Sequence, residues 1–243
     1  MYDKFFRKVF DEEKQYGIAE SERIVRSPYV LKCLARTFAG MRDSDVYFVI
    51  GRGNSGKSSI CNLASLAFGN FCSTVNLGSF ASKDGEKKKK LMWLVNAKYA
   101  RFIYANEDKN KALDAGTLKQ FSGQTDKYKG LSLYEKPQEF NHLANLWAFC
   151  NTHPKISGPK SAEFYQKRDR TIETEFQYEI GDEYEELKYL AYVKKADPKL
   201  EDFCERTYVQ EAFVAFVVKA FVPNVADVSI PKCVRQNRKE WTN

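Results

Sequence analysis

The octapeptide Gly-Arg-Gly-Asn-Ser-Gly-Lys-Ser at residues 51–58 constrains this chain more than any other feature of its sequence. It matches the pattern GxxxxGK[ST], in which glycines let successive backbone N–H groups turn toward one point and cradle a phosphate. The loop follows an apolar run at 46–50, typical of a buried strand, and precedes a helical stretch that Gly69 ends. Because a helix presents its positive N-terminal end to an anion, this strand–loop–helix unit predicts a phosphate site.

Individual positions of this loop have defined parts in binding a nucleotide. Lys57 can reach the β- and γ-phosphates, which makes it a candidate catalytic residue as well as a ligand. The hydroxyl of Ser58 can ligate Mg²⁺, so we expect a nucleotide bound together with this metal. The residues expected to contact the nucleotide are Gly51, Arg52, Gly53, Asn54, Ser55, Gly56, Lys57, Ser58 and Ser59.

Two further apolar runs, at 102–105 and 146–150, are typical of buried strands. Their alternation with helical stretches predicts an α/β fold with a central parallel sheet flanked by helices. Glu107 and Asp108 come just after the first run, and hydrolysis needs an acid there to hold Mg²⁺ or polarise water. Glu107 fits that part as a metal ligand, and Asp108 can share it. Asn151 follows the second run, where its amide can bond the γ-phosphate or the attacking water.

The composition argues against several classes of protein but does not identify the function. The 243 residues carry 39 basic and 32 acidic side chains, and the resulting net charge of +7 favours a polyanionic partner only weakly. Six scattered cysteines without a CxxC pair, and only two histidines, argue against a zinc site or a disulfide scaffold. We expect reduced thiols and an intracellular protein. No run of about 18 apolar residues occurs, so no membrane partner is expected.

Three segments are expected along the chain. Residues 1–42 are predicted to be a small helical N-terminal collar, 43–178 the ATPase core, and 179–243 a helical C-terminal segment. Residues 124–135 break the alternation of strands and helices, and their glycines predict a hairpin loop.

In their order along residues 27–222, these segments resemble a superfamily 3 helicase, with most similarity to the helicase domain of poxvirus-type primase-helicases of large DNA viruses, phages and plasmids. GRGNSGKS resembles the Walker A loop and RFIYANED the Walker B strand, with Glu107 at the acidic position. LKQFSGQTDKYKG resembles the segment that leads into a DNA-contacting hairpin, and LANLWAFCNTHPKI resembles motif C, with Asn151 as sensor. KRDRTIETEF resembles the segment that carries an arginine finger.

This resemblance implies an ATPase of the AAA+ type that uses ATP and Mg²⁺. The implied assembly is a homo-hexameric ring that moves on single-stranded or forked DNA, with a primase domain or protein as a further candidate partner. Arg170 is the best match to the arginine finger, and Arg168 is the second candidate. If the protein is viral, it is expected in the host cytoplasm or nucleus.

The implied DNA contacts are Lys119, Lys127, Tyr128 and Lys129. Two cations at a hairpin tip neutralise phosphate charge, and an aromatic ring between them can stack on a base or sugar. The alternative for these residues is an ordinary exposed basic turn. For the whole chain, the alternatives are another AAA+ NTPase, such as a packaging or RNA-remodelling motor, and a nucleotide-gated initiator ring that binds DNA without unwinding it.

Overall fold

The computed structural model describes residues 2–10, 25–81, 92–106, 112–123, 128–130 and 138–234. The described α-helices are α1 (Tyr2–Phe10), α3 (Arg26–Phe38), α4 (Lys57–Phe68), α5 (Ala115–Ser122), α6 (Ser161–Lys167), α7 (Gly181–Leu187), α8 (Leu200–Cys204) and α9 (Thr207–Lys219). Short 3₁₀ turns occur at η1 (Gly69–Phe71), η2 (Leu77–Phe80), η3 (Met92–Val95) and η4 (Val225–Asp227).

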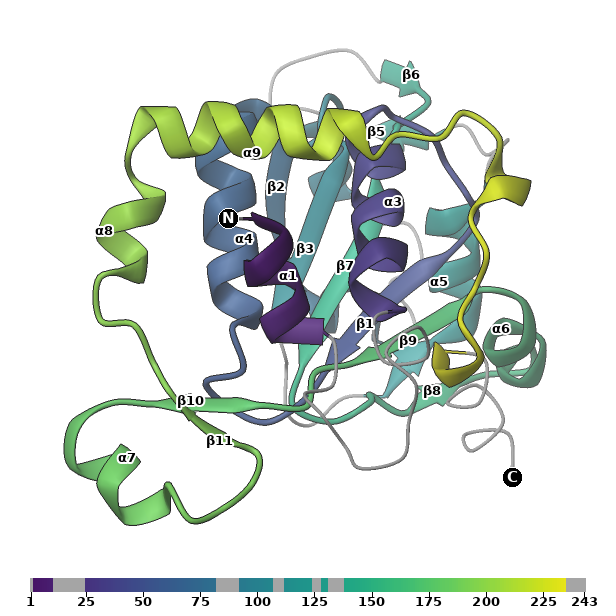
Figure 1. The fold of residues 1–243 in the computed structure, drawn as a ribbon. Helices are drawn as coiled ribbons and strands as arrows, with labels where there is room; N and C mark the ends of the chain where they lie inside the picture. Colours follow the sequence, from purple (N-terminus) through teal and green to yellow (C-terminus); the bar gives the residue numbers. More distant parts are fainter. Residues whose placement is uncertain are drawn as a thin grey trace.

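A parallel sheet forms the centre of the molecule (Figure 1). Its strands, in spatial order, are β2 (Cys72–Asn76), β3 (Phe102–Asn106), β7 (Asn145–Cys150), β1 (Val46–Ile50) and β9 (Asp169–Glu173). Every neighbouring pair is parallel, so the carboxyl ends of all these strands meet at one edge of the sheet. β1 and β7 are buried at every position, which explains why they appear in the sequence as continuous apolar runs.

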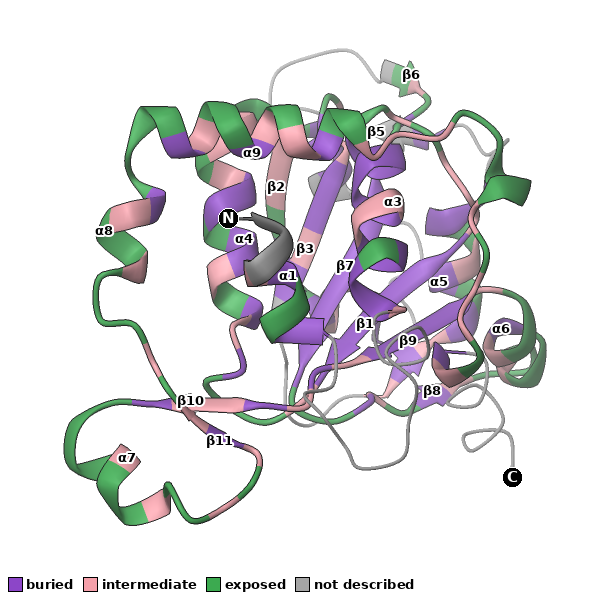
Figure 2. Ribbon diagram, in the orientation of Figure 1, coloured by how far each residue is buried: buried purple, intermediate pink, exposed green. Residues whose placement is uncertain are grey.

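Helices cover both faces of this sheet, and alternate residues of each strand contribute to one face or the other. Tyr47 and Val49 face a cluster that contains side chains of α1, α3, α4 and α9, the helices nearest the viewer in Figure 1. Phe48 and Ile50 face a second cluster with α5, α6 and η2. Figure 2 shows the buried residues concentrated in the sheet and on the helix faces turned toward it. The fold is therefore a layered α/β architecture of the P-loop NTPase kind.

Shorter strand pairs lie beside the main sheet. β4 (Leu113–Asp114) pairs with β8 (Ile156–Ser157), and β5 (Tyr128–Gly130) pairs with β6 (Gln138–Phe140). β10 (Gln177–Glu179) pairs in parallel with β11 (Val193–Lys195), and α7 crosses between them. In Figure 1 this last unit projects at the lower left, below α4.

The sequence predicted the central elements closely and the flanking ones less well. The strand at 46–50 and the helix at 57–68 have the expected bounds, and the other two core strands differ by one residue each. The hairpin prediction was wrong in position, because residues 128–130, expected near the tip, form a strand that pairs with 138–140. Residues 131–137 lie outside the described part. The segment after residue 179, expected to be helical, contains α7, α8 and α9, with the short strand β11 between α7 and α8.

The N-terminal helix is shorter in the described structure than the amphipathic stretch expected at residues 1–25. α1 covers Tyr2–Phe10, and residues 11–24 lie outside the described part. Side chains from α1, α3 and α9 share one apolar cluster with the sheet, and the division at residues 42 and 178 stays a prediction. Within the described residues, no helix combines the length and apolarity needed to cross a membrane.

Candidate nucleotide-binding site

The phosphate loop connects the carboxyl end of β1 to the first turn of α4. Glycine is required at two positions of this loop. A Cβ on Gly51 would lie 1.9 Å from the Thr174 hydroxyl oxygen, and Gly56 caps α4 with φ of +84°. Asn54 also lies in the left-handed region, with φ of +55°. Alternation of such conformations turns backbone N–H groups inward, which is the geometry of an anion-binding nest.

Lys57, the first residue of α4, is buried and points back into the loop. Its ammonium donates to the carbonyl oxygens of Gly51 at 2.8 Å and Arg52 at 2.6 Å, and to the Ser55 hydroxyl at 2.9 Å. The charge is thus held inside the curve of the loop, where a phosphate would lie. Ser58 is exposed and Ser59 is half-buried in the same first turn of α4.

The strand register brings other polar residues to this edge of the sheet. Ile50 pairs with Cys150, and Gly51 donates its N–H to the Cys150 carbonyl, so Asn151 directly follows the strand beside the loop. Asn151 is exposed there, as a phosphate or water contact requires. β3 ends at the same edge with Asn106, but Glu107 and Asp108 lie outside the described residues. Their assignment as the hydrolytic acid stays a prediction.

Thr174 follows β9, and its hydroxyl contacts the phosphate loop. Its hydroxyl lies 3.0 Å from the Ser55 hydroxyl and 3.2 Å from the Ile50 carbonyl oxygen, and its backbone N–H also donates to that carbonyl. Ser55 in turn accepts from Lys57, so a chain of hydrogen bonds connects the end of β9 to Lys57. Sequence patterns could not predict this contact, because Thr174 and Ser55 are 119 residues apart.

The unit formed by β10, α7 and β11 touches the loop from the other side. The Asn54 carbonyl accepts the Tyr178 N–H at 2.8 Å, and the Asn54 amide donates to the Glu179 carboxylate at 3.1 and 3.2 Å. The guanidinium of Arg52 lies 4.1 Å from the ring centre of Tyr192, within cation–π range. Sequence reasoning missed these partners.

Hydrogen bonds keep the Glu179 carboxyl charged. The bond from Gln177 at 2.6 Å, aided by the bond from Asn54, lowers the pKa of Glu179 below its usual value although partial burial opposes this. An ionised carboxylate is the stronger acceptor for the Asn54 amide. The tip of the phosphate loop is therefore tied to a charged partner.

The two arginine-finger candidates lie at the opposite edge of the sheet from Lys57. Val46, the first residue of β1, bonds the carbonyl of Arg168 and pairs with Asp169, so both arginines lie near the amino ends of the strands. Arg170 is buried and forms an ion pair with Asp45 at 2.7 Å, whereas Arg168 donates to the Ser122 hydroxyl at 2.9 Å. A five-residue strand spans roughly 16 Å. A single copy therefore does not bring either arginine to its own phosphate loop.

The predicted DNA contacts need one correction. Tyr128 is not an exposed aromatic at a hairpin tip: it is 5% exposed, donates its hydroxyl to the Gln120 carbonyl, and packs against the ring of His142. Its burial prevents base stacking in this conformation. Lys129 belongs to β5, opposite Glu139, and Lys127 lies outside the described residues. Lys119 forms an ion pair with Glu163 on the surface between α5 and α6.

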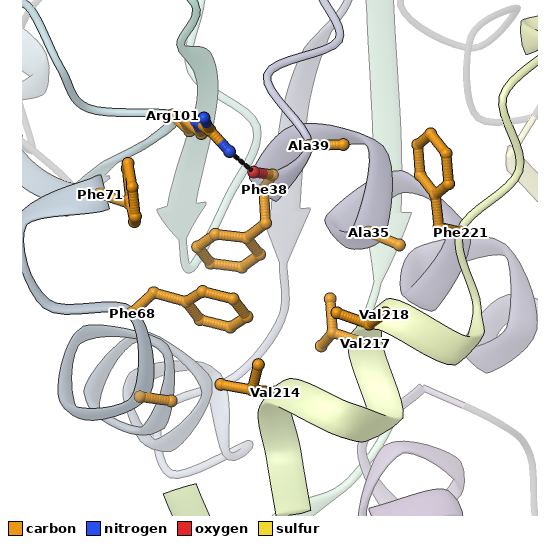
Figure 3. Close-up of a pocket in the computed structure, with 11 residues that line it drawn as sticks. Ala35, Phe38, Ala39, Phe68, Phe71, Arg101, Val214, Val217, Val218 and Phe221 are labelled. Carbon is orange, nitrogen blue, oxygen red and sulfur yellow. Dashed lines mark hydrogen bonds between the residues drawn. The ribbon is translucent and has the colours of Figure 1, made fainter. Parts of the chain in front are cut away.

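An apolar hollow of about 560 Å³ lies between α3, α4 and α9, far from the phosphate loop (Figure 3). Its rim includes Phe38, Phe68 and Phe221, and Arg101 contributes the charge, with its guanidinium donating to the Phe38 carbonyl at 2.6 Å. Arg101 immediately precedes β3, which places the hollow at the amino edge of the sheet. Its lining does not suit a phosphate.

Comparisons with known proteins agree with the α/β fold. No family model matches the chain. The chain is similar to a protein of Sputnik virophage described as "Putative helicase V13", with 23% identity over 219 residues. The match covers 88% of this chain and 27% of the virophage protein, so the chain spans about a quarter of that relative's length.

Solved structures of the NrS-1 C-terminal region in its apo state have a similar fold. One aligns with a TM-score of 0.59 over 98% of this chain and 52% of the other, at 12% identity. Another gives a TM-score of 0.55 over 95% and 50%, at 14% identity. At such identities the likeness concerns the fold alone. The chain thus combines a P-loop NTPase-like α/β fold with sequence similarity to a viral protein described as a helicase.

Proposed function

We propose that this chain is the ATP-hydrolysing motor of a DNA helicase, of superfamily 3 and the AAA+ type, from a viral or mobile-element replication system. The observation that carries the proposal is the position of Lys57, buried inside a phosphate loop at the carboxyl edge of a parallel sheet, with Asn151 alongside. The sequence similarity to the virophage protein, which extends over 88% of the chain, supports the helicase assignment.

The residues of the loop suit a nucleoside triphosphate. Backbone N–H groups of the loop and the first turn of α4 would bind the phosphates, and Lys57 would exchange its carbonyl acceptors for phosphate oxygens. Ser58 and Glu107 would hold Mg²⁺, which supplies neutralisation of the phosphate charge when bound. Glu107, with Asp108, would orient the attacking water, and Asn151 would hydrogen-bond that water or the γ-phosphate.

A ring of identical subunits would complete this site. Arg168 and Arg170 lie at the edge of the sheet away from their own loop, so either could serve only the loop of a neighbour. Arg168 needs to give up its hydrogen bonds to the Ser122 hydroxyl and the Lys119 carbonyl, whereas Arg170 must leave its ion pair with Asp45. We propose a homo-hexamer in which one of these arginines stabilises the transferring phosphoryl group. A primase domain or protein is a further proposed partner.

Helicase activity is tested by ATP hydrolysis and strand displacement on matched DNA and RNA forks. We expect hydrolysis that single-stranded DNA stimulates, and unwinding of the DNA fork. Unwinding of RNA alone would contradict the proposal in favour of an RNA-remodelling motor. Nucleotide binding and assembly with negligible turnover would contradict it in favour of an initiator ring. Light scattering with and without ATP and single-stranded DNA measures whether six copies assemble.

DNA contact is tested through the salt dependence of single-strand binding. Lys119, Lys127 and Lys129 are the remaining proposed contacts, since Tyr128 is buried. The double substitution Lys127→Ala with Lys129→Ala should reduce the slope of log affinity against log salt by about 1.4, because each phosphate contact on a single strand contributes about 0.7. An unchanged slope would reject these two contacts.

A further inference from the structure

The phosphate loop carries an unusual residue at its tip. Asn54 is a non-glycine residue with φ of +55°, a conformation that costs most L-residues energy and that asparagine tolerates better than most. It precedes Ser55 and Gly56, whose backbone N–H groups face the phosphate position in a loop of this pattern. If Asn54 relaxed to an ordinary conformation, the peptide groups that follow it would turn away.

Contacts from outside the loop hold Asn54 in this conformation. Its carbonyl accepts the Tyr178 N–H at 2.8 Å, and its side-chain amide donates to the Glu179 carboxylate at 3.1 and 3.2 Å. Glu179 is itself 5% exposed and is further fixed by Gln177 at 2.6 Å. The backbone of β10 bonds β11 on its other side, because Gln177 donates to Tyr192 and Ala196 donates to Glu179.

We propose that Glu179 is a positioning residue of the nucleotide site, which acts through Asn54 to keep the phosphate loop in its anion-binding conformation. The proposal rests on the proposed function, since it concerns how well this loop binds a nucleotide. Glu179 itself does not contact the nucleotide. Its contribution is to pre-organise the loop, so that binding does not have to fix the conformation of Asn54.

Two opposing effects of Glu179 can be separated by substitution. As an acceptor it orders Asn54, but as a negative charge close to the phosphate site it repels the ligand. Glu179→Gln keeps an acceptor oxygen and removes the charge, whereas Glu179→Ala removes both. If ordering dominates, Glu179→Ala weakens nucleotide binding and Glu179→Gln does not. Repulsion alone would make both variants bind more tightly.

The decisive experiment combines Glu179→Ala with Asn54→Gly. Glycine keeps access to positive φ but lacks the amide that Glu179 accepts from, so in the Asn54→Gly background Glu179→Ala has no such bond left to remove. We measure the affinity for ADP with Mg²⁺ by calorimetry and use Glu186→Ala as the control, because it removes an exposed acid of α7. Thermal unfolding of each variant reports on folding.

We expect Glu179→Ala to weaken ADP binding on the order of 5-fold, the effect of a charge-assisted hydrogen bond acting indirectly. Asn54→Ala should weaken it at least as much, whereas Glu179→Gln and Glu186→Ala should stay within about twofold of the wild type. In the Asn54→Gly background, Glu179→Ala should cause no further loss.

Three results would overturn the proposal. An equal loss from Glu179→Ala in both backgrounds would show that it acts elsewhere. Failure of Glu179→Gln to restore binding, or wild-type affinity in Glu179→Ala, would show that the hydrogen bond to Asn54 does not matter. These outcomes leave the proposed function intact as long as the wild type binds ADP. Absence of ADP binding by the wild type would overturn the proposed function, and the positioning role with it.

Discussion

The phosphate loop at 51–58 and the segment around Tyr128 were both expected to contact a polyanion, but only the loop has the predicted arrangement. In the loop, every backbone turn that the motif requires is present, and Lys57 points inward. In the second region, Tyr128 lies in the core instead of at an exposed tip. Because glycine positions specify the backbone geometry of a motif, that geometry can be predicted from the sequence. The exposure of a side chain depends instead on which residues pack against it.

Packing around Tyr128 shows why its exposure could not be read locally. Its ring lies 4.9 Å from that of His142, which stacks on Phe121 at 4.6 Å. The hydroxyl of Tyr128 donates to the Gln120 carbonyl at the end of α5. An alternating basic and aromatic sequence is equally compatible with a ring turned inward as an anchor or outward as a ligand contact. Here the ring anchors β5 against α5.

The largest expected effect is the loss of ATP hydrolysis on substitution of Lys57 in the phosphate loop. Lys57→Ala should reduce ATP hydrolysis by at least about 100-fold, because it removes the charge that neutralises the β- and γ-phosphates. Removal of an exposed cation by Lys219→Ala should leave the rate unchanged and serves as the matched control. Hydrolysis by Lys57→Ala within threefold of the wild type would contradict the assignment of the loop.

A change at Tyr128 should instead affect stability. Tyr128→Ala should lower the free energy of unfolding by about 3 kcal/mol, because it leaves a cavity beside the ring of His142. Tyr128→Phe should lower it by about 1 kcal/mol, the usual effect of losing one hydrogen bond. Urea unfolding measures both. Unchanged stability together with a loss of single-strand affinity would restore the predicted DNA contact and contradict the buried position.

The sequence predicted the elements that local patterns determine and failed for those that tertiary packing determines. β1 and α4 were predicted with their bounds, because a buried parallel strand is a continuous apolar run and the glycines mark both ends of the loop. The hairpin was misplaced by several residues, because neither of its strands is longer than three residues and its glycines suggested a turn too early. Short pairs take their register from tertiary packing.

The site divides in the same way. The loop residues and Asn151 are where strand ends and motif spacing predicted them. Thr174 and Glu179 were missed because each contacts a residue more than 100 positions earlier in the chain. The ion pair of Arg170 with Asp45 was equally invisible, since Asp45 precedes β1 and Arg170 belongs to β9. Sequence spacing predicts which residues share an element, and only the folded register shows which ones meet.

The third expected effect is a pH dependence of stability, and it concerns His142, whose ring packs against Tyr128. Burial, with a contribution from the nearby Arg42, lowers the pKa of His142 from 6.5 to about 3, and the neutral ring donates to the Phe121 carbonyl while accepting from the Ala144 N–H. Below pH 6.5 the unfolded chain binds a proton that the folded chain excludes, so this part of the stability is present above pH 6.5 and is lost as the pH falls toward 3. Between pH 7 and pH 5 the loss should be about 2 kcal/mol. His142→Gln, which keeps a donor but does not titrate, should flatten the pH dependence of urea unfolding by that amount. Identical slopes for the variant and the wild type would show that His142 does not contribute to the acid sensitivity, and that the packing around Tyr128 tolerates a charged ring.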